Sequence, residues 1–311
     1  MTPEAQTASI EMEARHCPLC GPGATKQTRF PANFTEDDLN AAIFSARRMP
    51  DRKHFRLVEC TGCGIVYSDP AATPGTLASL YRESSVNYGR QEEQIYRSYA
   101  SLLDRALERL EHRGTFVEVG GGRGFMLTYG AAHGFGRQIE IEPSGDAEKK
   151  FTPASKNASF SRRVFAQGVL PASSASLICF FQMLDHVPDP LGFLVAAHTA
   201  LEPGGVAVCC VHDTQALSAR VLGERSPIYD IEHAYLFNPD NLTRLFQRAG
   251  FGRIETFPLV NHYAIRHWLD LAPIPGGVRS MALRMLEKLQ LADMRIALNA
   301  GNFGVVAQKP R

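Results

Sequence analysis

Two C-x-x-C pairs near the N-terminus form the clearest chemical pattern in the chain. Cys17 and Cys20 stand in CPLCG, and Cys60 and Cys63 stand in CTGCG, so a glycine that permits a tight turn follows each pair. Thiolates three positions apart can grip one metal ion, and two such pairs make a tetrahedral four-sulfur set. The pattern predicts a structural Zn²⁺ site, with four free thiols or a redox pair as the alternatives. The 39 residues between the pairs exceed the usual spacing of about 15–20, so we expect an insertion there.

A glycine-rich turn is the second chemical pattern. Gly120, Gly122 and Gly124 give G-x-G-x-G after the apolar run TFVEV, but Phe125 stands where a dinucleotide fingerprint has its third glycine. The missing glycine weakens an NAD interpretation. Glu142 ends the next apolar run about twenty residues on, where a carboxylate can accept hydrogen bonds from both ribose hydroxyls of a nucleoside. A packing loop without a ligand is the alternative.

Strands that alternate with helices must position these residues. Helical spacing of leucines predicts helix within 77–112, and Gly114 ends that pattern. Short apolar strands alternating with helices predict a parallel, doubly wound α/β sheet. The predicted strands are 115–119, 137–143, 160–168, 175–184, 206–213, 252–260 and 302–310. The predicted helices between them include 125–134, 191–201 and 239–250.

Composition bounds the function. The 311 residues suggest two domains, or one large domain with an appendage. The net charge of +1 argues against a protein that coats nucleic acid or an anionic membrane. No run approaches the roughly 18–20 apolar residues of a membrane span, and the N-terminus has no signal-like apolar region. We therefore expect a cytoplasmic protein with no membrane partner. Cys179, Cys209 and Cys210 lie in predicted strands and should be inert core residues.

The successive segments FVEVGGGRGFML, IEIEPS, LICFFQMLDHVPDPLGFL and LEPGGVAVCCVHD resemble the motifs of class I S-adenosylmethionine-dependent methyltransferases. The resemblance implies a seven-stranded, mainly parallel Rossmann-like sheet and S-adenosylmethionine as the cofactor. It implies that Glu118 anchors the loop near the methionine ammonium and that Glu142 binds the ribose. The residues that it implies around the cofactor are Glu118, Gly120, Gly121, Gly122, Gly124, Glu142, Pro143, Gln167, Gln182 and Tyr88.

The cysteine pairs point to one subset of this methyltransferase family. A CPLCG and F-R-L-V-x-C-x-x-C-G-x-x-Y module ahead of such a domain resembles a subset that modifies sugars, surface glycans and natural products, best known for sugar C-methyltransferases. Two positions depart from the pattern. Gln167 follows the third strand where the family often has an acidic residue for the adenine, and Ser176 stands where an Asp commonly opens the fourth strand. We expect that 311 residues leave no room for the large C-terminal second domain of the sugar C-methyltransferases, which weakens the case for that substrate class.

Methyl transfer to oxygen or carbon needs a base, and an unperturbed imidazole titrates near neutrality. The segment YDIEHAYLF resembles the subset's E-H-x-x-x-F catalytic stretch and makes His233, with Glu232 and Tyr229, the first candidate. A structural histidine that caps a helix or packs against Phe237 is its alternative. His186 is the second candidate, and its alternative is a residue that shapes the pocket near the cofactor.

We expect a zinc-binding module over 1–75, a helical linker or lid over 76–112, and a methyltransferase domain over 113–311 with a helical insertion near 262–298. The predicted activity is methyl transfer to a sugar, a nucleotide-sugar or a natural-product intermediate. An RNA methyltransferase or RNA-binding protein is the alternative, and the neutral charge disfavours nucleic acid as a partner. A cofactor-binding protein without catalysis is a third hypothesis. The Met- and Leu-rich stretch 281–298 predicts core packing or the surface of a homodimer.

Overall fold

A seven-stranded sheet forms the centre of the protein, whose computed structural model describes residues 11–35, 52–83, 92–272 and 274–311. Its strands are β6 (Thr115–Val119), β7 (Arg137–Ile141), β8 (Ala158–Ser161), β9 (Ala175–Phe181), β10 (Leu201–His212), β12 (Ile254–Ala264) and β13 (Arg295–Gln308). Their order is β12-β13-β10-β9-β6-β7-β8. Neighbouring strands from β10 to β8 are parallel, and β13 is antiparallel to both of its neighbours. The predicted doubly wound α/β sheet is confirmed.

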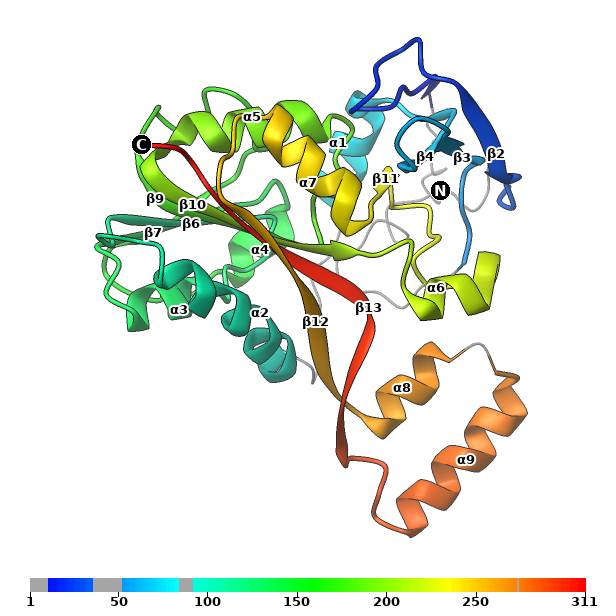
Figure 1. The fold of residues 1–311 in the computed structure, drawn as a ribbon. Helices are drawn as coiled ribbons and strands as arrows, with labels where there is room; N and C mark the ends of the chain where they lie inside the picture. Colours follow the sequence, from blue (N-terminus) through cyan, green and yellow to red (C-terminus); the bar gives the residue numbers. More distant parts are fainter. Residues whose placement is uncertain (1–10, 36–51, 84–91, 273) are drawn as a thin grey trace, which may run out of the picture.

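Helices cover both faces of this sheet because its central strands are apolar on both sides (Figure 1). Every residue of β9 is buried. Ile178 and Phe180 join the core beneath α5 (Pro190–Ala200) and α7 (Pro239–Arg248). Leu177 and Cys179 join the opposite core, beneath α2 (Glu92–Leu107) and α3 (Leu127–Ala132). Because helices cover the apolar side chains on both faces of these strands, the polar groups that a ligand can reach lie at the ends of the strands.

Cysteines in these strands belong to the core, as predicted. Cys179, Cys209 and Cys210 have no exposed surface. Burial raises the pKa of Cys179 and of Cys209 well above the usual range of a thiol, so both stay protonated at neutral pH.

Three predicted elements differ from the structure. The strand expected over 160–168 ends at Ser161, because the exposed Arg162 and Arg163 carry the chain away from the sheet edge. The helical stretch 77–112 contains α1 (Pro74–Glu83) and α2, and residues 84–91, with Tyr88, lie outside the described residues. The segment 262–298 is helical only within α8 (Ile265–Leu271) and α9 (Gly276–Lys288), and both of its ends are strand.

The cysteine-rich module builds a small sheet of its own in the order β11-β4-β3-β2. Its first three strands along the chain are β2 (Lys26–Phe30), β3 (Leu57–Cys60) and β4 (Val66–Ser68). The fourth, β11 (Tyr235–Leu236), comes from the far end of the chain and pairs with β4. Two further strands, β1 (Met12–Glu13) and β5 (Ala71–Ala72), pair beside it. The expected insertion between the cysteine pairs lies mostly within 36–51, outside the described residues.

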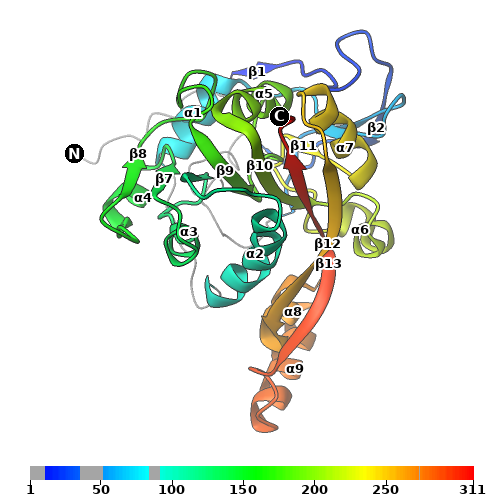
Figure 2. The same cartoon turned by 60° about the vertical axis from the view of Figure 1, so that its left-hand side comes forward.

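An arm projects from the body of the protein (Figures 1 and 2). Strands β12 and β13 continue beyond the large sheet as a two-stranded ribbon that carries α8 and α9. Met281, Met285 and Leu289 on α9 and just beyond it are exposed, and no residue of α9 is buried. Apart from Ala292, which is 2% exposed, the stretch 281–298 is therefore not part of the core. No helix in the described ranges combines the length and the apolar character that a membrane crossing requires.

Candidate functional site

The glycine loop follows β6 in the way that the sequence predicts. Gly120, Gly122 and Gly124 have φ of +70°, +67° and +76°, a region that favours glycine. A Cβ on Gly121 would lie 2.1 Å from Cδ of Glu118, and one on Gly120 would lie 2.6 Å from Cγ of Met183. The loop therefore needs glycine for its turn and for the close approach of two side chains.

Two buried carboxyl groups accept hydrogen bonds from backbone amides in this loop and just after it. Glu118 is 1% exposed, and its Oε2 accepts a hydrogen bond from the Met126 amide at 3.1 Å. Glu140 is the register partner of Glu118 on β7, and its Oε1 accepts from the Gly121 amide at 2.9 Å. Burial, and then the neighbouring Glu118, raises the pKa of Glu140 well above its usual range. Glu140 was not predicted from the sequence, although its place two residues before Glu142 puts both on one face of the strand.

The ends of β7 and β9 present the other predicted cofactor residues. Glu142 accepts from the Gly122 amide at 3.3 Å and from the Ser144 amide at 3.0 Å, and Pro143 follows it, half-buried. Gln182 directly follows β9 with φ +50°, and its amide donates to the Cys210 carbonyl at 2.8 Å. Because β7, β6 and β9 are parallel neighbours, these ends share one edge of the sheet. Gln167 lies apart from them, exposed in the loop after β8.

A cavity of about 690 Å³ borders the glycine loop on another side. Tyr96, Arg123, Gly124 and Phe125 are among its lining residues. Glu142 and Gln182 are not part of this lining. The ends of β6, β7 and β9, rather than this cavity, therefore define the candidate cofactor site.

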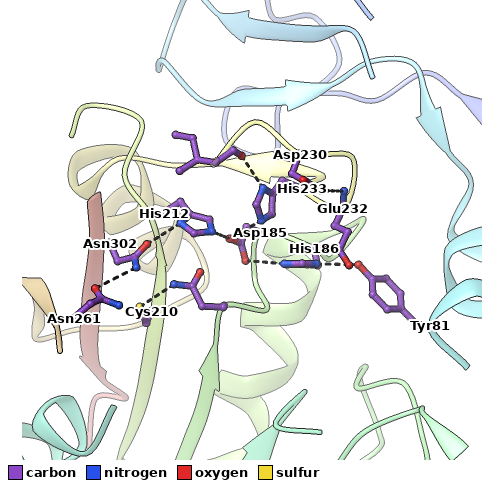
Figure 3. A network of polar contacts seen from close by, with 12 residues as sticks. Tyr81, Asp185, His186, Cys210, His212, Asp230, Glu232, His233, Asn261 and Asn302 are labelled. Atoms are coloured by element: carbon purple, nitrogen blue, oxygen red, sulfur yellow. Dashed lines mark hydrogen bonds and ion pairs between the residues drawn. The ribbon is translucent and has the colours of Figure 1, made fainter. Parts of the chain in front are cut away.

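Three histidines surround one buried carboxylate at the same edge of the sheet (Figure 3). Asp185, four residues beyond the end of β9, has no exposed surface. Nε2 of His186 lies 3.8 Å from its Oδ1, and Nε2 of His212 and of His233 lie 3.9 and 3.8 Å from its Oδ2. His212 ends β10, and His233 precedes β11. The two predicted histidines, His186 and His233, therefore lie beside Asp185 and His212. Asp185 follows β9 and His212 ends β10, and these two strands are parallel neighbours.

Hydrogen bonds at Nδ1 orient two of these rings. Nδ1 of His233 lies 2.7 Å from the Ile228 carbonyl oxygen, and Nδ1 of His212 lies 2.7 Å from Oδ1 of Asn302. Both oxygens are acceptors, so each Nδ1 carries the hydrogen and a neutral ring presents its lone pair at Nε2. Asn302 in turn donates from Nδ2 to Oδ1 of Asn261 at 3.4 Å. Burial, and then the neighbouring His233, lowers the pKa of His212 to about 3, so its ring is neutral at pH 7.

The surroundings of this cluster include Tyr81 and one of the two other predicted catalytic residues, Glu232, but not Tyr229. The Tyr81 hydroxyl lies 3.0 Å from Nδ1 of His186 and connects α1 to the cluster. Glu232 is half-buried beside His233, and its amide donates to Oδ1 of Asp230 at 3.4 Å. Tyr229 is not brought to Asp185, because its buried ring packs edge-on against Phe30.

Backbone and side-chain hydrogen bonds connect the His233 segment to the cysteine-rich module and to Asp185. Ser68 on β4 donates from Oγ to the His233 carbonyl at 3.0 Å and from its amide to the Ala234 carbonyl at 3.1 Å. The amides of Ala234 and Tyr235 donate to the Asp185 carbonyl at 2.7 and 3.1 Å. The module and the strand end therefore hold the segment from opposite sides.

The four N-terminal cysteines converge as their spacing predicts. Their sulfur atoms all lie within 4.8 Å of one another, and a tetrahedral ion with bonds of about 2.3 Å would space them about 3.8 Å apart. The two turns match, because the Gly21 amide donates to the Cys17 carbonyl and the Gly64 amide to the Cys60 carbonyl. A hydrogen bond from the Cys63 thiol lowers the pKa of Cys17 to about 5. The set could hold one metal ion.

Comparison with known protein families assigns the large sheet and its edge. A family model described as a methyltransferase domain matches residues 91–256, which is more than half of the chain. The chain belongs to this family. It is an S-adenosylmethionine-dependent methyltransferase, as the resemblance of its motifs implied, and the glycine loop and the acidic strand end of this methyltransferase lie inside the matched range.

Several solved structures are similar to the methyltransferase at low sequence identity. A chain from the Haloferax volcanii complex of the Trm112 methyltransferase activator is 17% identical, with coverage of 71% of this chain and 94% of that one and a TM-score of 0.48. A Thermotoga maritima S-adenosylmethionine-dependent methyltransferase is 17% identical, with 70% and 90% coverage and a TM-score of 0.46. One from Mesorhizobium loti is 15% identical, with 66% and 96% coverage and a TM-score of 0.44. Among curated proteins, none matches the chain.

Proposed function

We propose that this methyltransferase acts on a small molecule, a sugar, a nucleotide-sugar or a natural-product intermediate, and that His233 removes the proton from the methylated position. The observation that carries the proposal is the Asp185 cluster. It presents the His233 Nε2 lone pair at the same sheet edge as the glycine loop and Glu142. A base in that position lies on the side where the cofactor binds in a parallel α/β sheet.

The cofactor residues proposed from the sequence fall into two groups. Gly120, Gly121, Gly122 and Gly124, with Glu118 beneath them, would line the methionine end, and Glu142, followed by Pro143, would accept the ribose hydroxyls. Glu142 already accepts from two backbone amides, so its carboxylate is oriented before a ligand arrives. Gln182 at the end of β9 would complete this edge, and the exposed Gln167 is the proposed contact to the adenine. Tyr88 remains a prediction outside the described residues.

In the proposed reaction, a proton moves from the acceptor to His233 as the methyl group is transferred. Bound S-adenosylmethionine would supply an electrophilic methyl group on a sulfonium. His233 would accept the acceptor proton at Nε2, the freed electron pair would form the new bond to the methyl carbon, and the carbon–sulfur bond pair would stay on sulfur. Asp185 then faces an imidazolium and stabilises its charge, because opposite charges attract strongly where solvent is excluded. His233 later releases the proton to water.

The neighbouring groups receive supporting roles in this proposal. His186 is the second candidate base, and its contact with the Tyr81 hydroxyl orients its ring. Glu232 and Tyr229 would position the His233 segment, Tyr229 through its packing against Phe30. Neither Glu232 nor Tyr229 is required to touch the acceptor.

We also propose that the four cysteines bind Zn²⁺ and that the zinc module is structural. Support comes from its contact with the methyltransferase, because its sheet includes β11 and its Ser68 bonds to His233. Because the module contacts the His233 segment, a structural role accounts for it without RNA binding. The RNA hypothesis therefore has no separate observation in its favour.

A homodimer through the projecting arm is the proposed assembly. Val278, Met281, Met285 and Leu289 are exposed at helical spacing on and beyond α9. Apolar stripes of this kind are typical of contact surfaces. Light scattering during size-exclusion chromatography should give twice the chain mass, and a monomer at micromolar concentration would contradict the proposal.

The acceptor class can be tested by offering the enzyme several chemical classes of acceptor side by side. The purified protein is incubated with S-adenosylmethionine and, in parallel, with nucleotide-sugars, small phenols and hydroxy acids, or with total RNA. Release of S-adenosylhomocysteine is measured in each case. The proposal expects release with a small molecule. Methyl incorporation into RNA alone would contradict it.

A further inference from the structure

The geometry points to a divalent transition-metal site formed by Asp185, His212 and His233. A metal ion there would occupy the lone pairs that, in the proposed function, receive the acceptor proton. The consequence for activity rests on the proposed function, whereas the binding of the ion does not. The site is distinct from the four-cysteine set, because its donors are two imidazole nitrogens and a carboxylate.

The donor atoms have the separation that such a site requires. One ligand atom from each of the three residues lies within 4.8 Å of the other two, and the two Nε2–Oδ2 distances are 3.9 and 3.8 Å. Bonds of about 2.1 Å around a tetrahedral ion would place the donors about 3.4 Å apart. Small side-chain rotations close that difference, and 3.8 Å is too long for a direct hydrogen bond between an imidazole and this carboxylate oxygen.

The rings are prepared as metal ligands. Each Nδ1 is held by an oxygen acceptor, Ile228 for His233 and Asn302 for His212, so both Nε2 lone pairs face Asp185. Histidines that bind metals commonly donate their other ring N–H in this way, which sets the tautomer and the ring orientation. Asn261 supports Asn302 in turn. Two neutral imidazoles and a carboxylate suit Zn²⁺, Co²⁺, Ni²⁺ or Fe²⁺.

Electrostatics favour a cation at this point. The carboxylate of Asp185 has no exposed surface, and the His233 side chain is 9% exposed. A buried carboxylate is stabilised by a positive charge beside it. A proton on His233 supplies that charge in the proposed reaction. A metal ion supplies it without a proton, and three ligands leave a coordination position open for water or a substrate atom.

Binding is tested on the full-length protein with its cysteine site already filled by Zn²⁺. Co²⁺ is titrated by calorimetry, and its visible absorption is followed in parallel. We expect one further ion per chain, with visible d–d bands and no sulfur-to-cobalt charge transfer. His212→Gln should weaken this binding by about a hundredfold or more, since even removing groups that only support a ligand costs about 10–100-fold. His112→Gln, an exposed residue, is the matched control and should bind like wild type.

The inference is overturned if wild type takes up no ion beyond the cysteine site, or if His212→Gln binds Co²⁺ as tightly as wild type does. Circular dichroism checks that His212→Gln is folded. If it is not, His233→Gln decides the matter, because it removes a different ligand from the same site.

Inhibition separates this inference from the proposed function. Each protein's methyl-transfer rate is divided by its own rate without added metal. Co²⁺ should inhibit wild type and His112→Gln at the concentration at which it binds, and should inhibit His212→Gln only at much higher concentration. A rate that rises with Co²⁺ would contradict the inference that the ion occupies the lone pair that receives the acceptor proton. If no methyl transfer is found at all, the proposed function fails, while calorimetry still decides whether the ion binds.

Discussion

Ser68 donates a hydrogen bond from Oγ to the main-chain carbonyl of His233 at 3.0 Å, across 165 positions of the sequence. Both residues are buried. The bond continues the pairing of β4 with β11, so the cysteine-rich module and the candidate base form one structural unit. In the proposed function, this module would therefore set the position of a catalytic group that it does not itself supply.

Replacing Ser68 should disturb the position of His233 more than the overall fold. Ser68→Ala leaves a buried carbonyl short of one donor, which costs about 1–3 kcal/mol. We expect kcat to fall about tenfold, with the Kd for S-adenosylhomocysteine unchanged and the pH profile of kcat shifted. Ser101→Ala, on the exposed side of α2, should leave all three quantities unchanged. Equal loss of cofactor affinity and kcat would indicate general destabilisation instead.

Loss of the cysteine-bound metal should abolish activity as well as lower stability. Cys60→Ser removes one of the four sulfurs, and its 1% exposure leaves no room for the module to adjust. We expect loss of bound zinc by elemental analysis, a lower Tm and a rate below a hundredth of wild type. Cys209→Ala, which removes a core thiol outside the set, should keep its zinc. A zinc-free Cys60→Ser protein with the wild-type rate would refute the structural coupling.

Removing the Glu142 carboxylate should weaken cofactor binding. Hydrogen bonds to a charged group contribute about 1.5–3 kcal/mol, so Glu142→Ala should raise the Kd for S-adenosylhomocysteine by about ten- to a hundredfold. Calorimetry measures this directly. Glu148→Ala on α4 (Gly145–Lys150), where the side chain is about half exposed, is the control and should bind normally. An unchanged Kd in Glu142→Ala would remove Glu142 from the cofactor site.

Glu140 should make the stability of the protein depend on pH. Its pKa is raised well above the usual value of 4.5 by burial and by Glu118, so the folded state keeps a proton that the unfolded state releases above that pH. The free energy of unfolding therefore falls as pH rises from 4.5 towards the folded pKa. Glu140→Gln carries no such proton, so its stability relative to wild type should increase from about pH 5 to about pH 8 in urea unfolding. A constant difference between Glu140→Gln and wild type over this pH range would contradict a protonated Glu140.

Local patterns predicted the fold and part of the site. The short apolar runs and the glycine turn each lie within one short segment, so the strands and the loop around Gly120 followed from their own residues. The cysteine site followed from two short repeats. Asp185 and His212 could not be assigned together because they belong to different strand ends, and only the strand order β10-β9 brings them together. The pairing of β4 with β11 joins Tyr67 to Tyr235, a contact for which the sequence carries no local signal.

The role of His233 is tested most directly by the methyl-transfer rate of His233→Gln measured at saturating S-adenosylmethionine, with His112→Gln as the control. General base catalysis typically contributes about 10²–10⁴-fold. We predict that the rate falls by about that factor, while the Kd for S-adenosylhomocysteine and the Tm stay close to those of wild type. A folded His233→Gln protein that transfers methyl groups within about twofold of the wild-type rate would contradict the account.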